Sequence, residues 1–449
     1  MINLAEHPTV KRFYGERQAG SAQEAPSLLD AAWLREVCLD AGADDVGFVE
    51  AGRPEIAGQQ ADIQSVFPKT KTLISFVCRM NHENIRTPAR SIANLEFHHG
   101  TDDTNEVARR IVARLEGIGV AAINGGAAGF PMEADRWGSK MWVISHKPVA
   151  VAAGLGQMGI HRNVIHPKLG NFIGLGTVLM AAEVSEYSRP IAYNPCLECK
   201  LCVAACPTGA ISPEGEFNFS ACYTHNYREF MGGFNDWVEK VVESGSAREY
   251  RQKVSPAETV SMWQSLSFGA NYKAAYCMAV CPAGEDVIGP FLDNRKQFLE
   301  DVVKPLQNKP ETIYVVRNSD AEDYVARRFP HKKTKRVSNG LAGQGSVRSF
   351  LGGLPFAFQP GKSSGLDVTY HFTFTGEEEL KATIVIRNRK LEVQEGHEGE
   401  ADLRITVDGE TWLRFLRKDT SLLWALLTRK IRIHGSPRLL LSFSRCFPS

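Results

Sequence analysis

The feature that most constrains this chain is a run of four closely spaced cysteines, Cys196, Cys199, Cys202 and Cys206, followed at once by Pro207. Their spacing is C-x2-C-x2-C-x3-C-P, which is typical of iron–sulfur proteins. Thiolates at this spacing project into one small volume, and soft sulfur ligands suit iron–sulfur clusters. A disulfide framework is disfavoured in a long chain without secretory features, and zinc sites usually carry two separated cysteine pairs. The run therefore predicts an iron–sulfur cluster and a role in electron transfer.

A second cysteine region supports the first. Cys277 and Cys281 lie in the segment AAYCMAVCP, which again ends in Cys-Pro, and Cys222 lies between the two regions. In bacterial ferredoxins with two clusters, the last cysteine of each run completes the cluster of the other run. The first cluster is thus assigned to Cys196, Cys199, Cys202 and Cys281, and the second to Cys206, Cys222 and Cys277. Ala274 stands where a further cysteine would complete the second set, which predicts either a 3Fe-4S centre or a 4Fe-4S centre with a non-cysteine ligand.

Length and composition set the wider frame. At 449 residues the chain is too long for one ordinary core and suggests two or three domains. Its formal net charge of +1 gives no reason to expect nucleic acid as a partner. No apolar run reaches the ~18 residues of a transmembrane segment, and the first residues show neither an apolar signal core nor a paired-arginine export motif. We therefore expect a cytoplasmic protein in which Cys38, Cys78 and Cys446 are buried free cysteines.

Residues 1–190 combine helix and strand patterns and predict a mixed α/β sheet domain. One helix is expected near 27–41, with Ser27 as its N-cap and Gly42 as its stop. A second helix is expected at 105–118, where apolar residues recur at helical spacing. Short strands are predicted at 46–50, 72–78, 142–146, 149–154 and 173–184.

The rest of the chain divides into three regions, which gives an α+β multidomain protein overall. Residues 191–305 form the cysteine module, and residues 306–339 are predicted to be a linker. The basic stretch at 327–336 is predicted to be a solvated face. Residues 340–449 show strand patterns followed by helices, and the clearest strand, DVTYHFTF, alternates apolar and polar side chains from residue 367 to 374. This region encloses either an apolar pocket or a filled core.

Motifs upstream of the cysteines resemble one known family. The segment KPVAVAAGLGQMGIHRN (147–163) is similar to the P-x-A-x-x-AGLG-x-x-G-x-N turn of the family that unites epoxyqueuosine reductase with the reductive dehalogenases. LEFHH at 95–99 resembles a helix start in the queuosine enzymes, and SACYT at 220–224 matches the additional cysteine of the family. The resemblance covers roughly residues 25–300.

This resemblance implies a nitroreductase-like α/β domain that binds cobalamin, joined to a ferredoxin-like module with two clusters. In that family electrons pass through the clusters to a base-off cobalamin, whose reduced cobalt performs reduction at carbon. The positions implied in cobalamin binding are Gly154, Gly156, Gly159, His161, Asn163 and His98. A separate ferredoxin or flavodoxin is the expected electron donor. GLGQMG also fits G-x-G-x-x-G, but the residues after it are poor in helix signals, so nicotinamide binding is not expected.

The chemistry of this family needs a proton donor above the cobalt, and here the chain departs from the pattern. Lys140 occupies the position at which epoxyqueuosine reductases carry an aspartate, and the tyrosine of the dehalogenases is not found. Lys140 is therefore the first candidate for the catalytic acid. His146 is the second, because an imidazole titrates near neutrality.

The C-terminal region, 340–449, resembles the sterol-carrier-protein type lipid-binding domain through EADLRITVDGETWLRFLRKD and the following KIRIHG strand. The resemblance implies an apolar tunnel for a lipophilic small molecule, or a docking module of the same shape. The leading hypothesis is a cobalamin-dependent reductase that acts on a lipophilic or aromatic substrate, with halogenated compounds among the candidates. One alternative is reduction of an epoxide or another group with the same cofactors. Another is a non-enzymatic electron-transfer or cobalamin-handling protein.

Overall fold

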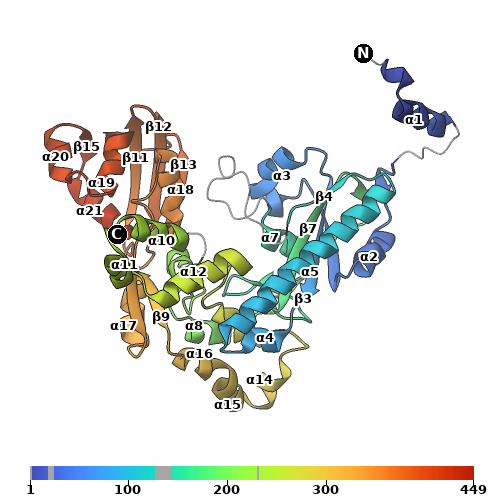
Figure 1. The fold of residues 1–449 in the computed structure, drawn as a ribbon, viewed down its shortest axis with the longest axis horizontal. Helices are drawn as coiled ribbons and strands as arrows, with labels where there is room; N and C mark the ends of the chain where they lie inside the picture. The colour runs from blue at the N-terminus through green and yellow to red at the C-terminus, as the bar shows by residue number, and fades with distance from the viewer. Residues whose placement is uncertain (1–2, 19–24, 127–143, 230–231, 449) are drawn as a thin grey trace.

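The structure is a computed structural model that describes residues 3–18, 25–126, 144–229 and 232–448. Its N-terminal part, blue to green in Figure 1, is built on a four-stranded antiparallel sheet in the order β2-β3-β7-β4. The strands are β2 (Asp45–Glu50), β3 (Thr72–Arg79), β4 (Ala122–Asn124) and β7 (Ile173–Met180). Helices cover both faces, so the sheet is the middle layer of three.

The two helical layers have separate hydrophobic cores. One face packs against α2 (Ala31–Asp40) and the long α5 (Arg90–Gly117). The other packs against α3 (Gln60–Val66) and α7 (His146–Ala152). Because both faces are covered, β3 is buried from its first residue to its seventh, which explains its continuous apolar sequence. The strands predicted at 46–50 and 72–78 are confirmed.

Two local predictions for this domain are corrected by the structure. Helix α2 begins at Ala31, because Asp30 is its N-cap and accepts a hydrogen bond from the Trp33 amide. The predicted cap, Ser27, instead precedes a short strand, β1 (Leu28–Leu29), which pairs in parallel with β8 (Glu183–Val184). The predicted strand at 149–154 is wrong, because this segment lies largely in α7. A short apolar run does not distinguish a buried strand from a buried helix.

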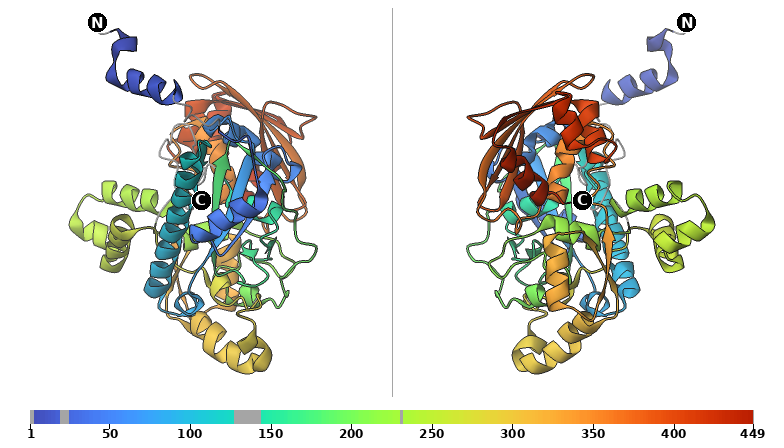
Figure 2. Two further views of the ribbon diagram at one scale, coloured as in Figure 1. Left: turned by 90° about the vertical axis from the view of Figure 1, so that its right-hand side faces the viewer. Right: turned by 90° about the vertical axis from the view of Figure 1, so that its left-hand side faces the viewer.

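The cysteine module joins this domain to the rest of the chain. Its cysteines lie on or beside three short helices, α8 (Leu201–Ala205), α9 (Phe219–Asn226) and α13 (Tyr276–Ala279). Between α9 and α13 the chain forms a helical unit that projects from the body of the protein, yellow-green in Figure 2. The helices of this projecting unit are α10 (Gly232–Val242), α11 (Ala247–Lys253) and α12 (Pro256–Phe268).

Smaller elements complete the first two regions. The helical ones are η1 (Leu4–Glu6), α1 (Pro8–Gln18), η2 (Pro54–Gln59), α4 (His82–Arg86), α14 (Gly289–Asp293), α15 (Arg295–Phe298), the π-helical η3 (Leu299–Val303) and α16 (Lys304–Asn308). The strands β5 (Gln157–Met158) and β6 (Val164–Ile165) form a small hairpin. None of the described helices is long and apolar enough to cross a bilayer.

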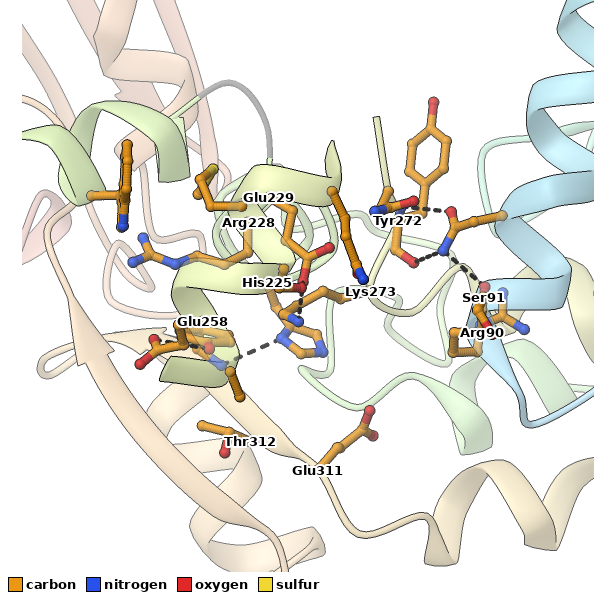
Figure 3. Close-up of a pocket in the computed structure, with 18 of the residues that line it drawn as sticks. Arg90, Ser91, His225, Arg228, Glu229, Glu258, Tyr272, Lys273, Glu311 and Thr312 are labelled. Carbon is orange, nitrogen blue, oxygen red and sulfur yellow. Dashed lines mark hydrogen bonds and ion pairs between the residues drawn. The ribbon is translucent and has the colours of Figure 1, made fainter. Parts of the chain in front are cut away.

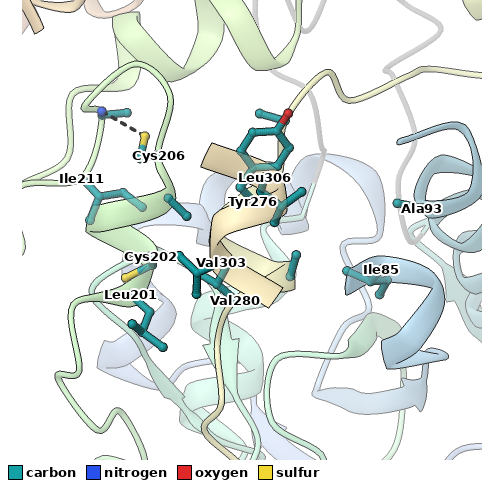
Figure 4. Close-up of a cluster of buried hydrophobic side chains, with 14 of the residues drawn as sticks. Ile85, Ala93, Leu201, Cys202, Cys206, Ile211, Tyr276, Val280, Val303 and Leu306 are labelled. Carbon is teal, nitrogen blue, oxygen red and sulfur yellow. Dashed lines mark hydrogen bonds between the residues drawn. The ribbon is translucent and has the colours of Figure 1, made fainter. Parts of the chain in front are cut away.

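The segment predicted as a linker, 306–339, is a folded β-α-β unit. Strands β9 (Thr312–Val316) and β10 (Lys333–Val337) pair in parallel, with α17 (Asp320–Arg328) between them. Apolar side chains of β9 and α17 enter the same hydrophobic core as the cysteine helices, part of which is shown in Figure 4. The basic stretch is also not uniformly solvated, because the Lys332 side chain is only 1% exposed. It makes an ion pair with Glu311, which lies 21 residues earlier.

The C-terminal region, orange to red in Figure 1, is a five-stranded sheet with helices. The sheet order is β13-β12-β11-β14-β15, with β11 and β14 parallel and the other pairs antiparallel. The strands are β11 (Asp367–Thr375), β12 (Leu380–Arg387), β13 (Lys390–Glu395), β14 (Leu403–Asp408) and β15 (Ile431–Gly435). The helices are α18 (Val347–Ala357), α19 (Gly409–Leu416), α20 (Leu422–Leu427) and α21 (Pro437–Cys446).

The alternation predicted for β11 is confirmed, and its inward side chains define the C-terminal core. Tyr370, Phe372 and Phe374 are buried, and the Phe372 ring lies 5.3 Å from the Trp412 ring between centroids. Phe350 of α18 contacts the same tryptophan at 5.6 Å. Edge-to-face pairs of this kind add to the stabilisation from burial alone. The described side chains thus give this region an aromatic core of its own.

Candidate functional site

The two Cys-Pro motifs are built alike. Helices α8 and α13 contact each other, and each starts directly after a residue with left-handed backbone, Lys200 (φ 61°) and Ala275 (φ 51°). Each helix then leads into a Cys-Pro sequence. This correspondence pairs Cys202 with Cys277 and Cys206 with Cys281, and it pairs Cys199 with Ala274. The motifs are therefore related by an approximate internal symmetry, although only one carries all its cysteines.

The structure brings the seven predicted cysteines near one another, and Cys277 of the predicted second group also influences Cys202 and Cys281 of the first. In the first group, burial raises the pKa of the Cys202 thiol, and the neighbouring thiols of Cys277, Cys281, Cys199 and Cys196 add to the increase. In the second group, burial raises the pKa of Cys222 well above its ordinary value, and the thiols of Cys206 and Cys277 act in the same direction. Mutual electrostatic influence of this strength requires proximity in a poorly solvated interior.

Burial also determines what these thiols need from a metal. It raises the pKa of Cys281 to about 12 and that of Cys277 to about 11, so both are protonated at neutral pH when no cation is bound. Binding of iron must displace these protons. Within the part of the chain that the structure describes, no three His, Cys, Asp or Glu side chains converge as ligands of a single ion. Each thiolate of an iron–sulfur cluster binds a different iron atom, so a cluster does not require three ligands to converge on a single ion.

The position of the missing cysteine is held by α9. The backbone amides of Ala274 and Ala275 both donate to the side-chain oxygen of Asn226, at 3.0 and 2.9 Å. Asn226 lies one helical turn after Cys222 on α9. The loop before α13 is thus fixed against α9, the helix that carries Cys222.

Sequence reasoning missed Lys147, which lies between the second cysteine group and the predicted cofactor loop. Its Nζ donates to the Arg162 carbonyl at 2.7 Å and to Asn163 Oδ1 at 3.0 Å. Burial lowers the pKa of Lys147, whereas the thiols of Cys277 and Cys222 oppose that decrease. Its only sequence signal was its place just before the proline of the motif that starts at residue 148.

The three predicted glycines have roles within the fold. Gly154 has a left-handed backbone (φ +74°), and a Cβ there would lie 2.3 Å from the Arg189 carbonyl oxygen. A Cβ on Gly156 would lie 2.4 Å from the Ile165 carbonyl oxygen. Gly159 is likewise closed off, by the Ile165 side chain at 2.7 Å. Close backbone neighbours therefore require glycine at 154 and 156, whatever the loop binds, whereas at 159 the neighbouring Ile165 side chain can shift.

His161, from the same loop, presents an unused donor. The ring is 4% exposed, and its Nδ1 accepts a hydrogen bond from the Asn163 amide at 3.1 Å. Burial, with a smaller effect of Lys147, lowers the pKa of His161 to about 4, so the ring is neutral and its proton is on Nε2. That buried Nε2 has no hydrogen-bond partner among the described residues. A buried donor without a partner fits a bound group.

The structure describes one of the two predicted proton donors, His146, but not Lys140. Lys140 lies outside the described residues. His146 is in the protein interior, where its Nδ1 is 2.9 Å from the Thr177 hydroxyl and its Nε2 is 2.6 Å from the Gly126 carbonyl oxygen. Burial lowers the pKa of His146 to about 4. Both ring nitrogens are already engaged, which favours a structural role over the predicted role as proton donor.

The remaining predicted residue, His98, is on α5 and lines a separate pocket of about 790 Å³ (Figure 3). Its Nε2 is 2.8 Å from the Ala270 carbonyl oxygen, so it belongs to the wall of this pocket formed by the segment after α12. The pocket lies beside the second motif, because the Arg90 guanidinium sits over the Tyr276 ring at 5.4 Å. Tyr276 directly precedes Cys277.

The pocket combines aromatic walls with fixed donors. Trp237, Phe268 and Tyr272 contribute aromatic surface. His225 is 1% exposed, and its Nδ1 accepts from the Tyr314 amide at 3.3 Å, which leaves Nε2 as a donor. Neither that atom nor two guanidinium nitrogens of Arg90 have a partner among the described residues. Burial lowers the pKa of His225 to about 3, so its ring stays neutral.

Comparison with known proteins supports the predicted resemblance. Residues 359–448 match the family model described as the SCP-2 sterol transfer family. Over 80 residues, 18% of this chain, the chain is 39% identical to an epoxyqueuosine reductase of Staphylococcus aureus and covers 20% of that protein. Over 83 residues, 18% of this chain, it is 37% identical to an epoxyqueuosine reductase of Prochlorococcus marinus and covers 26% of it. The chain thus matches about a quarter or less of the length of these relatives.

Three solved structures are similar to parts of this chain at low sequence identity. A catabolic reductive dehalogenase, NpRdhA, is 16% identical with a TM-score of 0.36, over 61% of this chain and 34% of that chain. Epoxyqueuosine reductase from Streptococcus thermophilus is 16% identical with a TM-score of 0.33, over 61% of this chain and 75% of that chain. Sterol carrier protein 2 from Yarrowia lipolytica is 10% identical with a TM-score of 0.18, over 20% of this chain and 77% of that chain.

Proposed function

We propose that this protein is an iron–sulfur and cobalamin-dependent reductase that acts on a lipophilic or aromatic substrate. The observation that carries the proposal is the convergence of seven cysteines around the contacting helices α8 and α13. Thiols that converge at this spacing suit a soft metal centre, which displaces their protons when it binds. The local similarity to curated epoxyqueuosine reductases supports the reductase class.

Each cysteine group would hold one cluster. Cys196, Cys199, Cys202 and Cys281 provide four thiolates for a 4Fe-4S cluster. The second group provides three, from Cys206, Cys222 and Cys277, for a 3Fe-4S cluster or a 4Fe-4S cluster with another ligand. Electrons enter from a separate ferredoxin or flavodoxin in the reducing cytoplasm.

Cobalamin is the second implied cofactor, and when bound it would supply reduced cobalt for reduction at carbon. The residues of the loop fit such a group, because the buried Nε2–H of His161 has no partner among the described residues. Lys147 donates to Arg162 and Asn163 of this loop, and the thiols of Cys277 and Cys222 influence its pKa. We propose that His161 and Asn163 hold the cofactor beside that group, with Gly154, Gly156 and Gly159 shaping the loop. Lys140 stays the proposed proton donor.

The pocket beside Tyr276 supports an aromatic substrate with a hydrogen-bond acceptor. Its aromatic walls suit a flat apolar ring, and the unpaired donors of Arg90 and His225 suit an acceptor on that ring. The SCP-2 match at 359–448 supports a lipophilic molecule in the C-terminal region. We propose that molecules of one class, aromatic and lipophilic, bind both in the pocket beside Tyr276 and in the C-terminal region.

The proposal is tested by anaerobic reconstitution with hydroxocobalamin, removal of excess cofactor and measurement of the absorption spectrum. We expect one retained, base-off cobalamin per chain and turnover of an aryl halide under a strong reductant. Turnover of an aryl epoxide but not the halide would select the epoxide alternative. Retained clusters without any retained corrinoid would contradict the proposed enzyme and leave an electron carrier.

A further inference from the structure

The C-terminal end of the chain carries a concentrated, unpaired positive charge. Residues 409–449 contain eight Lys and Arg against two Asp and Glu, whereas the whole chain has 52 Lys and Arg against 51 Asp and Glu. All eight cationic side chains are exposed, and none forms an ion pair with another residue that the structure describes. They are Arg414, Arg417, Lys418, Arg429, Lys430, Arg432, Arg438 and Arg445. A neutral protein thus has one strongly basic end.

Exposed apolar side chains lie in the same region. Helix α20 has the sequence LLWALL, and only Ala425 among its described side chains is fully buried. Trp424 is 47% exposed and Leu427 is 80% exposed, and Leu441 on α21 is 67% exposed. Figure 1 places α19, α20, β15 and α21 together at one end of the molecule, away from the sheet domain at residues 25–190.

The cations and the apolar side chains are in direct contact at α20. The Lys430 ammonium lies 5.0 Å from the centroid of the Trp424 ring. Arg429, the residue before it, has a left-handed backbone (φ 57°) at the turn that follows α20. The end of α20 therefore presents a tryptophan and a leucine bordered by two adjacent cations.

We propose that α20, with its flanking cations, docks onto the anionic surface of a lipid bilayer. Trp424 and Leu427 would enter the boundary between headgroups and acyl chains, where tryptophan is favoured. The surrounding Lys and Arg side chains would contact the phosphate groups of anionic lipids. A helix of six residues lies at such an interface and does not span it.

A basic surface also attracts nucleic acid, but the apolar side chains favour the membrane. A nucleic-acid surface gains affinity from cations and from aromatic rings that stack on bases. The exposed leucines at 427 and 441 add nothing to either interaction. In contrast, binding to a bilayer scales with both buried apolar area and attraction to anionic lipid.

The docking is independent of the proposed redox chemistry, because none of these residues belongs to the cysteine groups or to the loop at 154–163. It adds to that chemistry a route by which a lipophilic molecule reaches the protein directly from a membrane. The test therefore needs no turnover and no bound cofactor, and its failure is distinguishable from failure of the reductase proposal.

The experiment is flotation of the full chain with vesicles of phosphatidylcholine, alone or with about one third phosphatidylserine. We expect binding to the anionic vesicles only. The double variant Arg429→Gln/Lys430→Gln is expected to weaken binding about 25-fold, at about fivefold per cation. Leu427→Ser is expected to weaken it roughly tenfold through the lost apolar contact.

A matched control removes the same charge elsewhere in the domain. Lys381 and Lys390 are exposed cations on β12 and β13, at the opposite edge of the sheet from β15. The variant Lys381→Gln/Lys390→Gln is expected to bind like the wild type, and circular dichroism checks that all variants are folded.

Three results would overturn the proposal. One is no binding to anionic vesicles, and another is equal loss in the control variant. The third is tight binding of a single-stranded RNA probe that competes with vesicles, if Leu427→Ser leaves the RNA affinity unchanged. That result would identify a nucleic-acid surface instead.

Discussion

The buried ion pair between Lys332 and Glu311 offers a sharp test of how the β-α-β unit is held together. The two side chains are 1% and 9% exposed. Lys332 Nζ donates to Glu311 Oε1 at 2.5 Å and to the Leu306 carbonyl at 3.3 Å. Lys332→Met removes the cation and leaves the carboxylate buried, and loss of one partner of such a pair costs about 3–5 kcal/mol. Because Glu311 still accepts from the Tyr276 hydroxyl at 2.7 Å and keeps Lys309 Nζ at 3.5 Å, we expect about 3 kcal/mol, the lower end of that range.

The free energy of unfolding is measured from urea unfolding of the full chain. The double variant Lys332→Met/Glu311→Gln, which leaves no buried charge, is expected to recover to within about 1 kcal/mol of the wild type. The control is Arg348→Met, which breaks the exposed pair with Glu395 (67% and 65% exposed) and is expected to cost less than about 1 kcal/mol. A Lys332→Met loss as small as that of Arg348→Met would refute the reasoning, as would a double variant no more stable than the single one.

The pH dependence of the same variant follows from the carboxylate. Burial raises the pKa of Glu311, but His225, Lys332 and the Tyr276 hydroxyl together hold it below its ordinary value. Without Lys332, burial is less opposed and the folded-state pKa rises. A raised folded-state pKa favours folding below the unfolded value, about 4.3, and disfavours it at higher pH. The stability difference between wild type and Lys332→Met should therefore narrow as the pH falls towards 4.3.

Three further predictions address the site. Ala274→Cys supplies the thiolate that the second motif lacks and is expected to abolish the EPR signal of an oxidised three-iron cluster, and a signal that persists unchanged would contradict this role for residue 274. Gly156→Ala places a Cβ 2.4 Å from the Ile165 carbonyl oxygen and should destabilise the fold by about 1–3 kcal/mol, whereas Gly58→Ala, with nothing within 4 Å, should be neutral in the same unfolding assay. Burial lowers the pKa of His146 to about 4, so the neutral ring stabilises the fold above about pH 6.5, and this stabilisation is lost as the pH falls below that value. The variant His146→Gln should therefore flatten the curve of unfolding free energy against pH between 7 and 5. An unchanged slope would contradict the buried, neutral state of His146.

Short-range patterns predicted much of the fold. The alternation that starts at Val368 predicted β11 because a strand at the boundary of a core must bury every second side chain. The spacing of Cys196, Cys199, Cys202 and Cys206 indicated that these four thiols lie close together, because one turn of helix and its flanking loop join them. In both cases the information lies within about ten residues.

Other features depended on contacts between distant segments. Lys147 faces Cys222 and Cys277, and nothing near residue 147 in the sequence indicates that neighbourhood. The segment 306–339 was predicted as a linker from its prolines and charges, but its strands pair only with each other, in parallel. Lys332 of this segment is buried, and its charge is balanced by the ion pair with Glu311.

The helical unit between α9 and α13 shows the same limit. Its helices α10, α11 and α12 project from the body, and residues of α12 form a wall of the pocket that also contains His98. His98 matches a motif of the related enzymes, but its place is set by the carbonyl of Ala270, far along the chain. Motif position alone therefore did not predict which site this histidine would join.

The central claim, that the two cysteine groups hold iron–sulfur clusters, is tested most directly by iron and sulfide analysis of the protein after anaerobic reconstitution. Two clusters predict roughly seven to eight iron atoms per chain, with a similar amount of sulfide. Less than about one iron atom per chain, with the thiols still free to react with a thiol reagent, would contradict the account.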